Sequence, residues 1–205
     1  FMSQAGILKG FKKLKKGKQL ELLPYVIGSQ FSYRNDPSDP DSPFINDKVK
    51  GDLGLGIKYG FSSNLTGEIS FNPDFSQVES DAAQINVNSS SAVFYPEKRP
   101  FFLDGANIFN SYINVVYTRM LNNPLYTAKL IGKIDDIDVG YLMGYDQSTP
   151  YIIPTKFGSD FIQTDLRSFG NALRLKKSLK GSSFIGFIGT DHETGDSYNR
   201  VAGFD

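Results

Sequence analysis

The stretch from residue 52 to residue 59 alternates strictly between two kinds of side chain. Leu53, Leu55, Ile57 and Tyr59 are apolar, whereas the residues between them are small or charged. A period of two places alternate side chains on opposite faces of an extended strand, while a helix would scatter them around its axis. The stretch therefore predicts a β-strand with one apolar face, and the rest of the chain must supply its partners.

The same alternation recurs along the chain. Further segments with this pattern lie at residues 20–34, 65–72, 112–118, 126–130, 137–145 and 168–176. Gly, Pro, Asn, Asp and Ser are frequent between them, and the 20 Gly and 10 Pro disfavour long helices. We therefore predict an all-β fold of antiparallel strands joined by turns. In the first segment, Leu23, Tyr25 and Ile27 share one face.

Two architectures contain strands with one apolar and one polar face. A soluble sandwich packs the apolar faces together, whereas an outer-membrane barrel presents the apolar face to lipid and encloses a polar lumen. The strands reach about ten residues, which spans a bilayer when the strand is tilted. Tyr and Phe mark strand ends, as in interfacial girdles, and the polar face carries Gly, Ser, Asn and isolated charges. We predict an antiparallel transmembrane β-barrel of outer-membrane type.

Charge and residue counts disfavour several classes of function. The 22 basic and 22 acidic residues balance, so the overall charge predicts no binding to nucleic acid. The chain has no Cys and one His, His192, which we expect in a loop at 190–194. Thiolate metal sites are excluded and a zinc site is disfavoured. No nucleophile elbow or phosphate-binding loop occurs, and we predict neither a cofactor nor a metal.

Both ends of the chain suggest neighbouring segments. Residues 1–19 carry a basic run without interleaved aromatic residues, which favours a linker from a preceding domain over a patch that binds lipid phosphate or nucleic acid. Phe1 is not a natural initiator, and residues 198–205 have the pattern of a strand. We therefore expect residues 20–205 to be the N-terminal part of a β-barrel domain, and the chain to be an incomplete fragment of it.

The segment 94–109 differs from the strands around it, because Pro96 and Pro100 remove backbone donors and five aromatic residues follow no regular period. Short barrel turns lie on one side of the membrane and long loops on the other. Counted in this way, the strands at 65–72 and 112–118 both run upward. The connection 74–111 must then return across the height of the barrel, and we predict that it forms a plug-like internal loop.

Charged and aromatic side chains of this loop and the facing wall are the candidate lumen or ligand residues. They are Glu68, Asp74, Glu79, Asp81, Tyr95, Glu97, Lys98, Arg99, Phe101, Phe102 and Asp104. We expect Arg99 to bind wall carboxylates and tie the loop to the wall. The set forms either a structural tether or a polar strip that selects a solute, with rings that could stack on sugars. Glu79 and Glu97 could form the carboxylate pair of a glycosidase, but sequence does not show their separation, so we assign no catalytic residue.

Several motifs resemble a bacterial family known as DUF5916. They include LELLPY at 20–25, SNLT at 63–66, NPDFSQVE at 72–79, FYPEKRPFFL at 94–103, LRLKK at 173–177 and SYNR at 197–200. The resemblance implies an outer-membrane β-barrel of a Gram-negative envelope, preceded by a carbohydrate-binding domain of the family 9 type. Such proteins are sometimes labelled membrane-associated hydrolases, a label that no motif of this chain supports.

Three functions stay open on these grounds. In the first, a barrel in the bacterial outer membrane, in contact with its lipid, binds or admits glycans or other small solutes past a constricting lumenal loop. In the second, the protein is a membrane-anchored glycan hydrolase. In the third, the barrel is a scaffold or partner subunit of an envelope complex.

Overall fold

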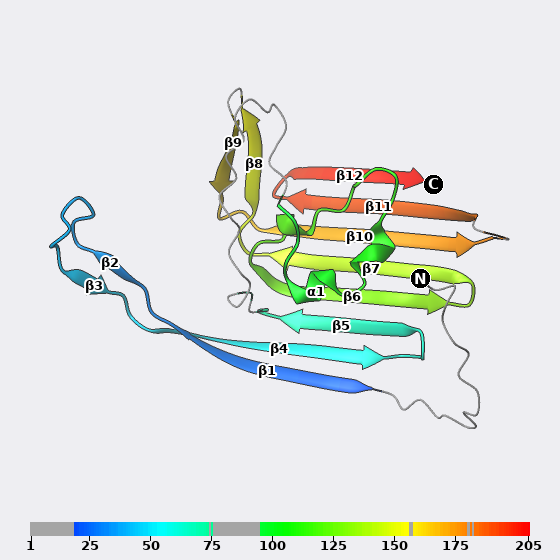
Figure 1. Ribbon diagram of the computed structural model, residues 1–205, viewed down its shortest axis with the longest axis horizontal. Coiled ribbons are helices and arrows are strands. Elements are labelled where there is room, and N and C mark those ends of the chain that lie inside the picture. The colour runs from blue at the N-terminus through cyan, green and yellow to red at the C-terminus, as the bar shows by residue number, and fades with distance from the viewer. Residues whose placement is uncertain (1–18, 74, 76–94, 156–157, 180, 182) are drawn as a thin grey trace, which may run out of the picture.

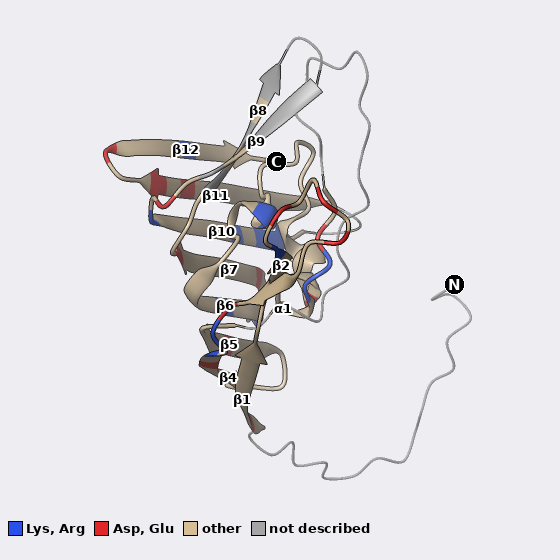
Figure 2. Ribbon diagram, turned by 90° about the vertical axis from the view of Figure 1, so that its left-hand side faces the viewer, with Lys and Arg blue, Asp and Glu red and all other residues tan. Residues whose placement is uncertain are grey.

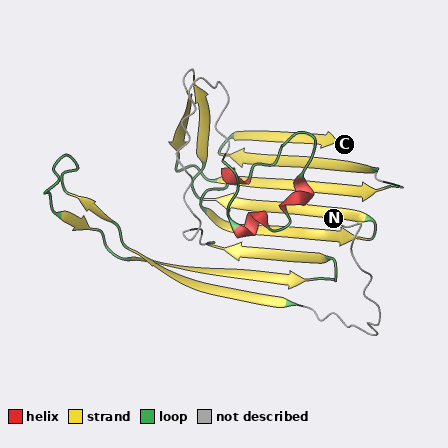
Figure 3. Ribbon diagram, in the orientation of Figure 1, coloured by secondary structure: helices red, strands yellow, loops and turns green. Residues whose placement is uncertain are grey.

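The computed structural model describes residues 19–73, 75, 95–155, 158–179, 181 and 183–205. Its main element is an eight-stranded antiparallel sheet, which confirms the all-β prediction (Figures 1 and 3). In spatial order the strands are β1 (Leu20–Ser29), β4 (Lys50–Gly60), β5 (Leu65–Phe71), β6 (Pro124–Ile134), β7 (Ile137–Asp146), β10 (Ser168–Ser178), β11 (Phe184–Thr194) and β12 (Ser197–Phe204). Within the described residues the sheet is open, with β1 and β12 at its edges.

Two short hairpins extend from one end of this sheet (Figure 1). One pairs β2 (Ser32–Arg34) with β3 (Phe44–Asn46), and the other pairs β8 (Pro150–Thr155) with β9 (Gly158–Gln163). The same end carries the connection between β5 and β6. Tight turns at 61–64 and 135–136 lie at the opposite end, where β10 ends and β11 begins. The predicted separation of short turns from long connections therefore holds only in part: the loop predicted at 191–197 is wrong, because the two-residue turn between β11 and β12 lies at the end that carries the long connections.

The register divides the sheet into an apolar face and a polar face, because directly opposed residues of antiparallel strands point the same way. The apolar face includes Val26, Leu53, Leu55, Ile57, Ile69, Phe71, Leu130, Tyr141, Tyr145, Leu173, Leu175 and Phe187. The polar face includes Lys58, Glu68, Thr127, Lys129, Leu142, Gly144, Gly170, Ala172, Arg174, Thr190 and His192. His192 thus lies in β11, and its predicted place in a loop is wrong.

The first strand departs from the simple pattern. Leu23, Tyr25 and Ile27 do share one face, but it is the polar face, since Tyr25 lies opposite Gly54. The Tyr25 ring fills the space beside Gly54, where a Cβ atom would clash with it. Its hydroxyl donates a hydrogen bond to the Asn72 carbonyl oxygen at 2.7 Å. Tyr25 therefore lies on the polar face because its ring packs beside Gly54 and its hydroxyl binds the backbone just after the end of β5.

The strand predicted at 112–118 is wrong. β5 pairs directly with β6, so the connection between them begins and ends at the same end of the sheet. Its residues 110–117 form no strand, and Tyr112 is 99% exposed. A short alternating run becomes a strand only where a sheet edge is free to pair with it, and β6 already occupies that edge of β5. The connection 74–111 therefore does not link two parallel-running strands.

Residues 95–123, here called the cover segment, lie across the polar face of the sheet (Figures 1 and 2). The segment contains α1 (Pro100–Leu103), η2 (Ala106–Phe109) and η3 (Thr118–Met120). Its buried side chains Phe101, Phe102 and Leu121 form the core together with Leu142 and Ala172 of the sheet. Packing of the cover segment thus depends on an apolar patch within the polar face.

Glycines in β7 let the cover segment approach closely. A Cβ atom at Gly144 would lie 2.6 Å from Leu121, and one at Gly140 would lie 2.6 Å from Ile108. The small residues that alternate with apolar ones in β7 are therefore the floor on which the cover segment packs.

No described helix is long and apolar enough to cross a membrane.

Candidate functional site

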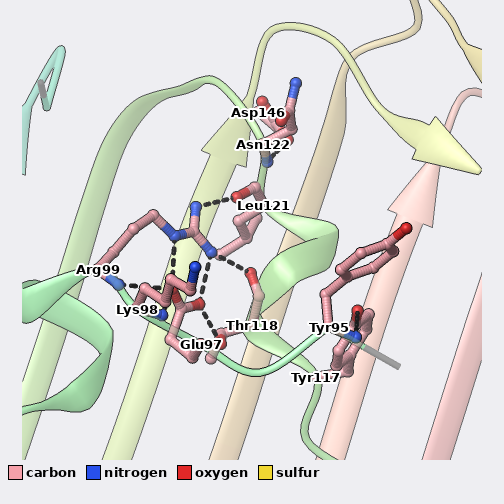
Figure 4. Close-up of polar contacts among 9 residues, drawn as sticks. All are labelled: Tyr95, Glu97, Lys98, Arg99, Tyr117, Thr118, Leu121, Asn122 and Asp146. Carbon is pink, nitrogen blue, oxygen red and sulfur yellow. Dashed lines mark hydrogen bonds and ion pairs between the residues drawn. The ribbon is translucent and has the colours of Figure 1, made fainter. Parts of the chain in front are cut away.

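Glu97 and Arg99 form a buried ion pair near the start of the cover segment (Figure 4). Arg99 Nε and Nη2 donate to the two carboxylate oxygens of Glu97 at 2.8 and 2.7 Å. The Thr118 hydroxyl also donates to Glu97, at 2.5 Å. Arg99 Nη2 reaches the Thr118 carbonyl oxygen at 2.8 Å, and Nη1 donates to the carbonyl oxygen of Leu121. This cluster joins the start of the cover segment to its last helical turn.

The cluster is buried and enclosed by aromatic rings. Arg99 is 4% exposed, and its guanidinium lies 4.2 Å from the Phe102 ring centre and 4.9 Å from that of Phe75. The expectation that wall carboxylates hold Arg99 is wrong, because its carboxylate partner is Glu97, only two residues away. A turn that brings the Arg99 backbone N–H to Glu97 Oε1 at 2.9 Å makes this local pairing possible.

Lysines of the sheet, not Arg99 of the cover segment, join the cover segment to the sheet. Lys129 of β6 donates to the carbonyl oxygens of Phe101 at 2.6 Å and Asp104 at 3.0 Å, and its side chain is 5% exposed. Its ammonium nitrogen lies 3.2 Å from a carboxylate oxygen of Glu68. Lys58 of β4 pairs with Asp104 at 2.9 Å. The hydrogen bond from Lys58, against the opposing effect of burial, lowers the pKa of Asp104.

Asp146 anchors the other end of the cover segment. This fully buried residue ends β7, and its carboxylate accepts hydrogen bonds from the backbone N–H groups of Asn122 at 2.5 Å and Asn123 at 2.7 Å (Figure 4). The chain that leaves η3 is thereby turned into β6. Together with Lys129, Asp146 places the cover segment on the polar face.

The predicted candidates fall into separate groups in the structure. Glu68 and Asp104 belong to the lysine network, Glu97 and Arg99 to the buried cluster, and Phe101 and Phe102 to the core. The Lys98 backbone N–H donates to Glu97, and the Tyr95 backbone N–H donates to the Tyr117 hydroxyl. Asp74, Glu79 and Asp81 lie outside the described residues. Lys129, Asp146 and Thr118 were missed, although an isolated Lys among apolar neighbours in a strand was a usable signal.

Two of the cavities in the described structure lie between the cover segment and the sheet. One, of about 160 Å³, is bordered by Tyr95, Asp104, Phe109, Arg119 and Lys129 among others. The second, of about 340 Å³, lies between residues 114–121 and the polar face of β10 to β12. In the part of the chain that the structure describes, no group of three or more His, Cys, Asp or Glu side chains is placed to hold a metal ion.

The ionisation of Glu97 predicts a loss of stability in acid. Burial opposes ionisation, but hydrogen bonds from Arg99 and Thr118 outweigh it and lower the pKa of Glu97 from 4.5 to about 2. The depressed pKa stabilises the fold fully above pH 4.5, and this contribution is lost as the pH falls towards 2. The loss amounts to about 3 kcal/mol in the free energy of unfolding.

Denaturant unfolding between pH 5 and pH 2 measures this effect. Glu97→Gln is the matched variant, since it removes the titrating group and nearly preserves the shape. We expect the wild type to lose its advantage over Glu97→Gln across this range. An unchanged difference between the two proteins would contradict the assignment.

Most of the residues of this candidate site lie in a stretch that matches one protein family. The profile of a family described as a domain of unknown function (DUF5916) matches residues 18–132, more than half of the chain. The match includes β1, β4, β5 and the whole cover segment, with the Glu97–Arg99 cluster. Comparison with curated proteins and with solved structures gives no match. The chain belongs to the DUF5916 family.

Proposed function

We propose that this chain forms part of the wall of a β-barrel in the outer membrane of a Gram-negative envelope. In this proposal the apolar face contacts lipid, the polar face lines the lumen, and the cover segment is a constriction at which glycans or other small solutes bind or pass. The observation that carries the proposal is the distribution of side chains over the sheet: charged side chains are buried beneath the cover segment, and large apolar side chains are exposed on the other face.

The exposed apolar residues support contact with lipid. Leu53 is 71% exposed, Ile185 59% and Phe71 49%, and all three lie on the apolar face. A soluble protein rarely exposes an apolar surface that continues across many strands. The alternation of apolar and polar residues, with the long connections gathered at one end of the sheet, is typical of outer-membrane barrels.

The arrangement of the cover segment supports a constriction. A loop that only crossed a barrel mouth would need few contacts with the wall, whereas this one is bound by Lys129 and Asp146, both buried. Hydrogen bonds to charged groups are stronger than those between neutral groups, and they hold the segment in one position. A fixed lumenal segment leaves a defined set of openings for a solute.

The chemistry of Glu97 argues against a glycan hydrolase centred on this residue. Both of its carboxylate oxygens accept hydrogen bonds from Arg99, and its pKa of about 2 keeps it ionised at neutral pH. A general acid needs a pKa near the working pH, and a nucleophile needs an accessible oxygen. Glu97 therefore serves the structure of the cover segment.

Cysteine labelling of whole cells tests the topology of the proposed barrel. The chain has no Cys, so single replacements report one position each. Asp41 lies in the long connection between β2 and β3, and Asn107 lies in η2; both residues are exposed in the structure. We expect a bulky, impermeant maleimide to label Asp41→Cys and to spare Asn107→Cys, because the barrel wall encloses η2.

A small maleimide serves as the control, since it should label both cysteines in purified protein. Equal rates of labelling by the bulky reagent at the two positions on whole cells would place η2 on the surface and overturn the lumenal position of the cover segment.

A further inference from the structure

The larger cavity lies under the last part of the cover segment. Val116, Tyr117 and Leu121 form its roof, and Ala172, Thr190 and Val201 lie on the opposite side. Its volume of about 340 Å³ is at the lower end of the range for small-molecule sites. Gly170 and Ala172 supply a floor of small residues in β10, so the space results from the sequence of the sheet.

The cavity presents neutral polar groups and apolar groups, but no charge from the sheet. Asp191 borders it through the backbone alone, because the register places its side chain on the apolar face. There its carboxylate accepts a hydrogen bond from Arg200 Nε at 2.8 Å and lies 3.5 Å from the Asn171 amide. An ionic ligand would therefore lose its hydration without gaining an opposite charge, which is costly.

One polar group of the cavity has an unused hydrogen-bonding position. The Nε2 atom of His192 is buried and has no hydrogen-bond partner among the described residues. Buried polar atoms are nearly always paired, so this atom lacks its usual partner, and a rotation of the His192 ring towards the cavity would let a ligand supply one. Thr190 and Asn199 border the same space and add a hydroxyl and an amide. A ligand with several hydroxyl groups would match this set.

We propose that this cavity binds an uncharged molecule of about the size of one sugar ring, with hydroxyl groups directed to Thr190 and Asn199 and, after a rotation of its ring, to His192 Nε2. The apolar C–H surface of such a ring matches Val116 and Val201, and the Tyr117 ring offers an aromatic face. The inference deepens the proposed function, on which its lumenal setting rests: it assigns a place and a charge preference to the solute.

Nuclear magnetic resonance of the histidine ring tests the proposal directly. His192 is the single histidine of the chain, so its ring carbon resonance reports this cavity alone, and His192→Gln identifies the signal. The probes are glucose, N-acetylglucosamine and the anion glucuronate, each added to the detergent-solubilised protein. We expect the two neutral sugars to shift the ring resonance in a saturable manner and glucuronate to leave it unchanged.

Two variants and a control establish the location. Val201→Phe fills the cavity from β12 and should abolish the shift, whereas Ala202→Phe adds the same ring to the apolar face of that strand and should preserve it. Gly170→Ala is the milder variant: its Cβ atom would lie 3.5 Å from His192 and 3.6 Å from Leu121, an ordinary contact, and should weaken binding.

The results separate this inference from the proposed function. An unchanged His192 resonance with both neutral sugars up to their solubility limits would overturn the site, and so would an equal shift with glucuronate or a shift that persists in Val201→Phe. Because the measurement needs no membrane, a protein that fails the cysteine-labelling test yet shows the sugar-dependent shift would retain the site and lose the barrel.

Discussion

Replacement of Arg99 by alanine is expected to lower the free energy of unfolding by about 3–5 kcal/mol, the usual effect of removing one partner of a buried ion pair. The change leaves the Glu97 carboxylate, whose side chain is 13% exposed, without its cation. It also removes the donors to the carbonyl oxygens of Thr118 and Leu121, which hold the last helical turn of the cover segment. Chemical unfolding followed by tyrosine fluorescence measures the loss, since the chain has no Trp.

The matched control is Lys133→Ala. Lys133 pairs with Asp138 at 3.8 Å beside the turn between β6 and β7, where the two side chains are 40% and 34% exposed. Water replaces the partners of an exposed charge, so we expect this variant to unfold almost like the wild type. Arg99→Lys should resemble Arg99→Ala more than the wild type, because an ammonium group cannot bond Glu97, Thr118 and Leu121 in one plane. Similar stabilities of the Arg99→Ala and Lys133→Ala proteins would contradict the structural role of the cluster.

The strands were predictable because burial and exposure alternate with the period of the backbone. Leu53, Leu55 and Ile57 lie on one face in the structure, as the pattern requires. The same rule failed at 112–118, where the apolar residues alternate but β6 already occupies the neighbouring edge of β5. Periodicity describes the faces of a strand, whereas pairing depends on which edges remain free, and that is a property of the whole sheet.

The candidate site was predictable in its members but not in its pairings. Arg99 and Glu97 stood out as charges in an apolar segment, yet their mutual contact depends on the turn between them. Lys129 and Asp146 bind backbone groups of the cover segment. Every residue has such groups, so the sequence does not show which of them a side chain will bind. Their roles follow from the path of the cover segment across the sheet, which local sequence does not determine.

The two charged networks make different contributions to the cover segment. The Glu97–Arg99 cluster joins parts of the segment to one another, whereas Lys58 and Lys129 join it to the sheet through Asp104. A variant of the first network changes the shape of the segment, and a variant of the second changes its attachment. If the segment constricts a lumen, variants of both networks should alter the passage of solutes. Variants of the Glu97–Arg99 cluster should in addition lose much of their stability.

The apolar face carries the prediction that separates a membrane barrel from a soluble sheet. Leu55 lies in the middle of β4, opposite Pro24 of β1 and Phe71 of β5. In a bilayer, arginine at this position would face the hydrocarbon, and we expect Leu55→Arg to destabilise the folded protein by about 2–4 kcal/mol. Unfolding and refolding in lipid vesicles measures this difference.

Gly56→Ser tests the other face of the same strand. A Cβ atom at Gly56 would lie 3.5 Å from Leu23, so the side chain fits without strain. Its hydroxyl would join the polar face, and we expect a much smaller effect than at Leu55. In water, by contrast, arginine on the exposed apolar face would keep its hydration and cost little. Equal tolerance of Leu55→Arg and Gly56→Ser would therefore show that the apolar face does not meet lipid.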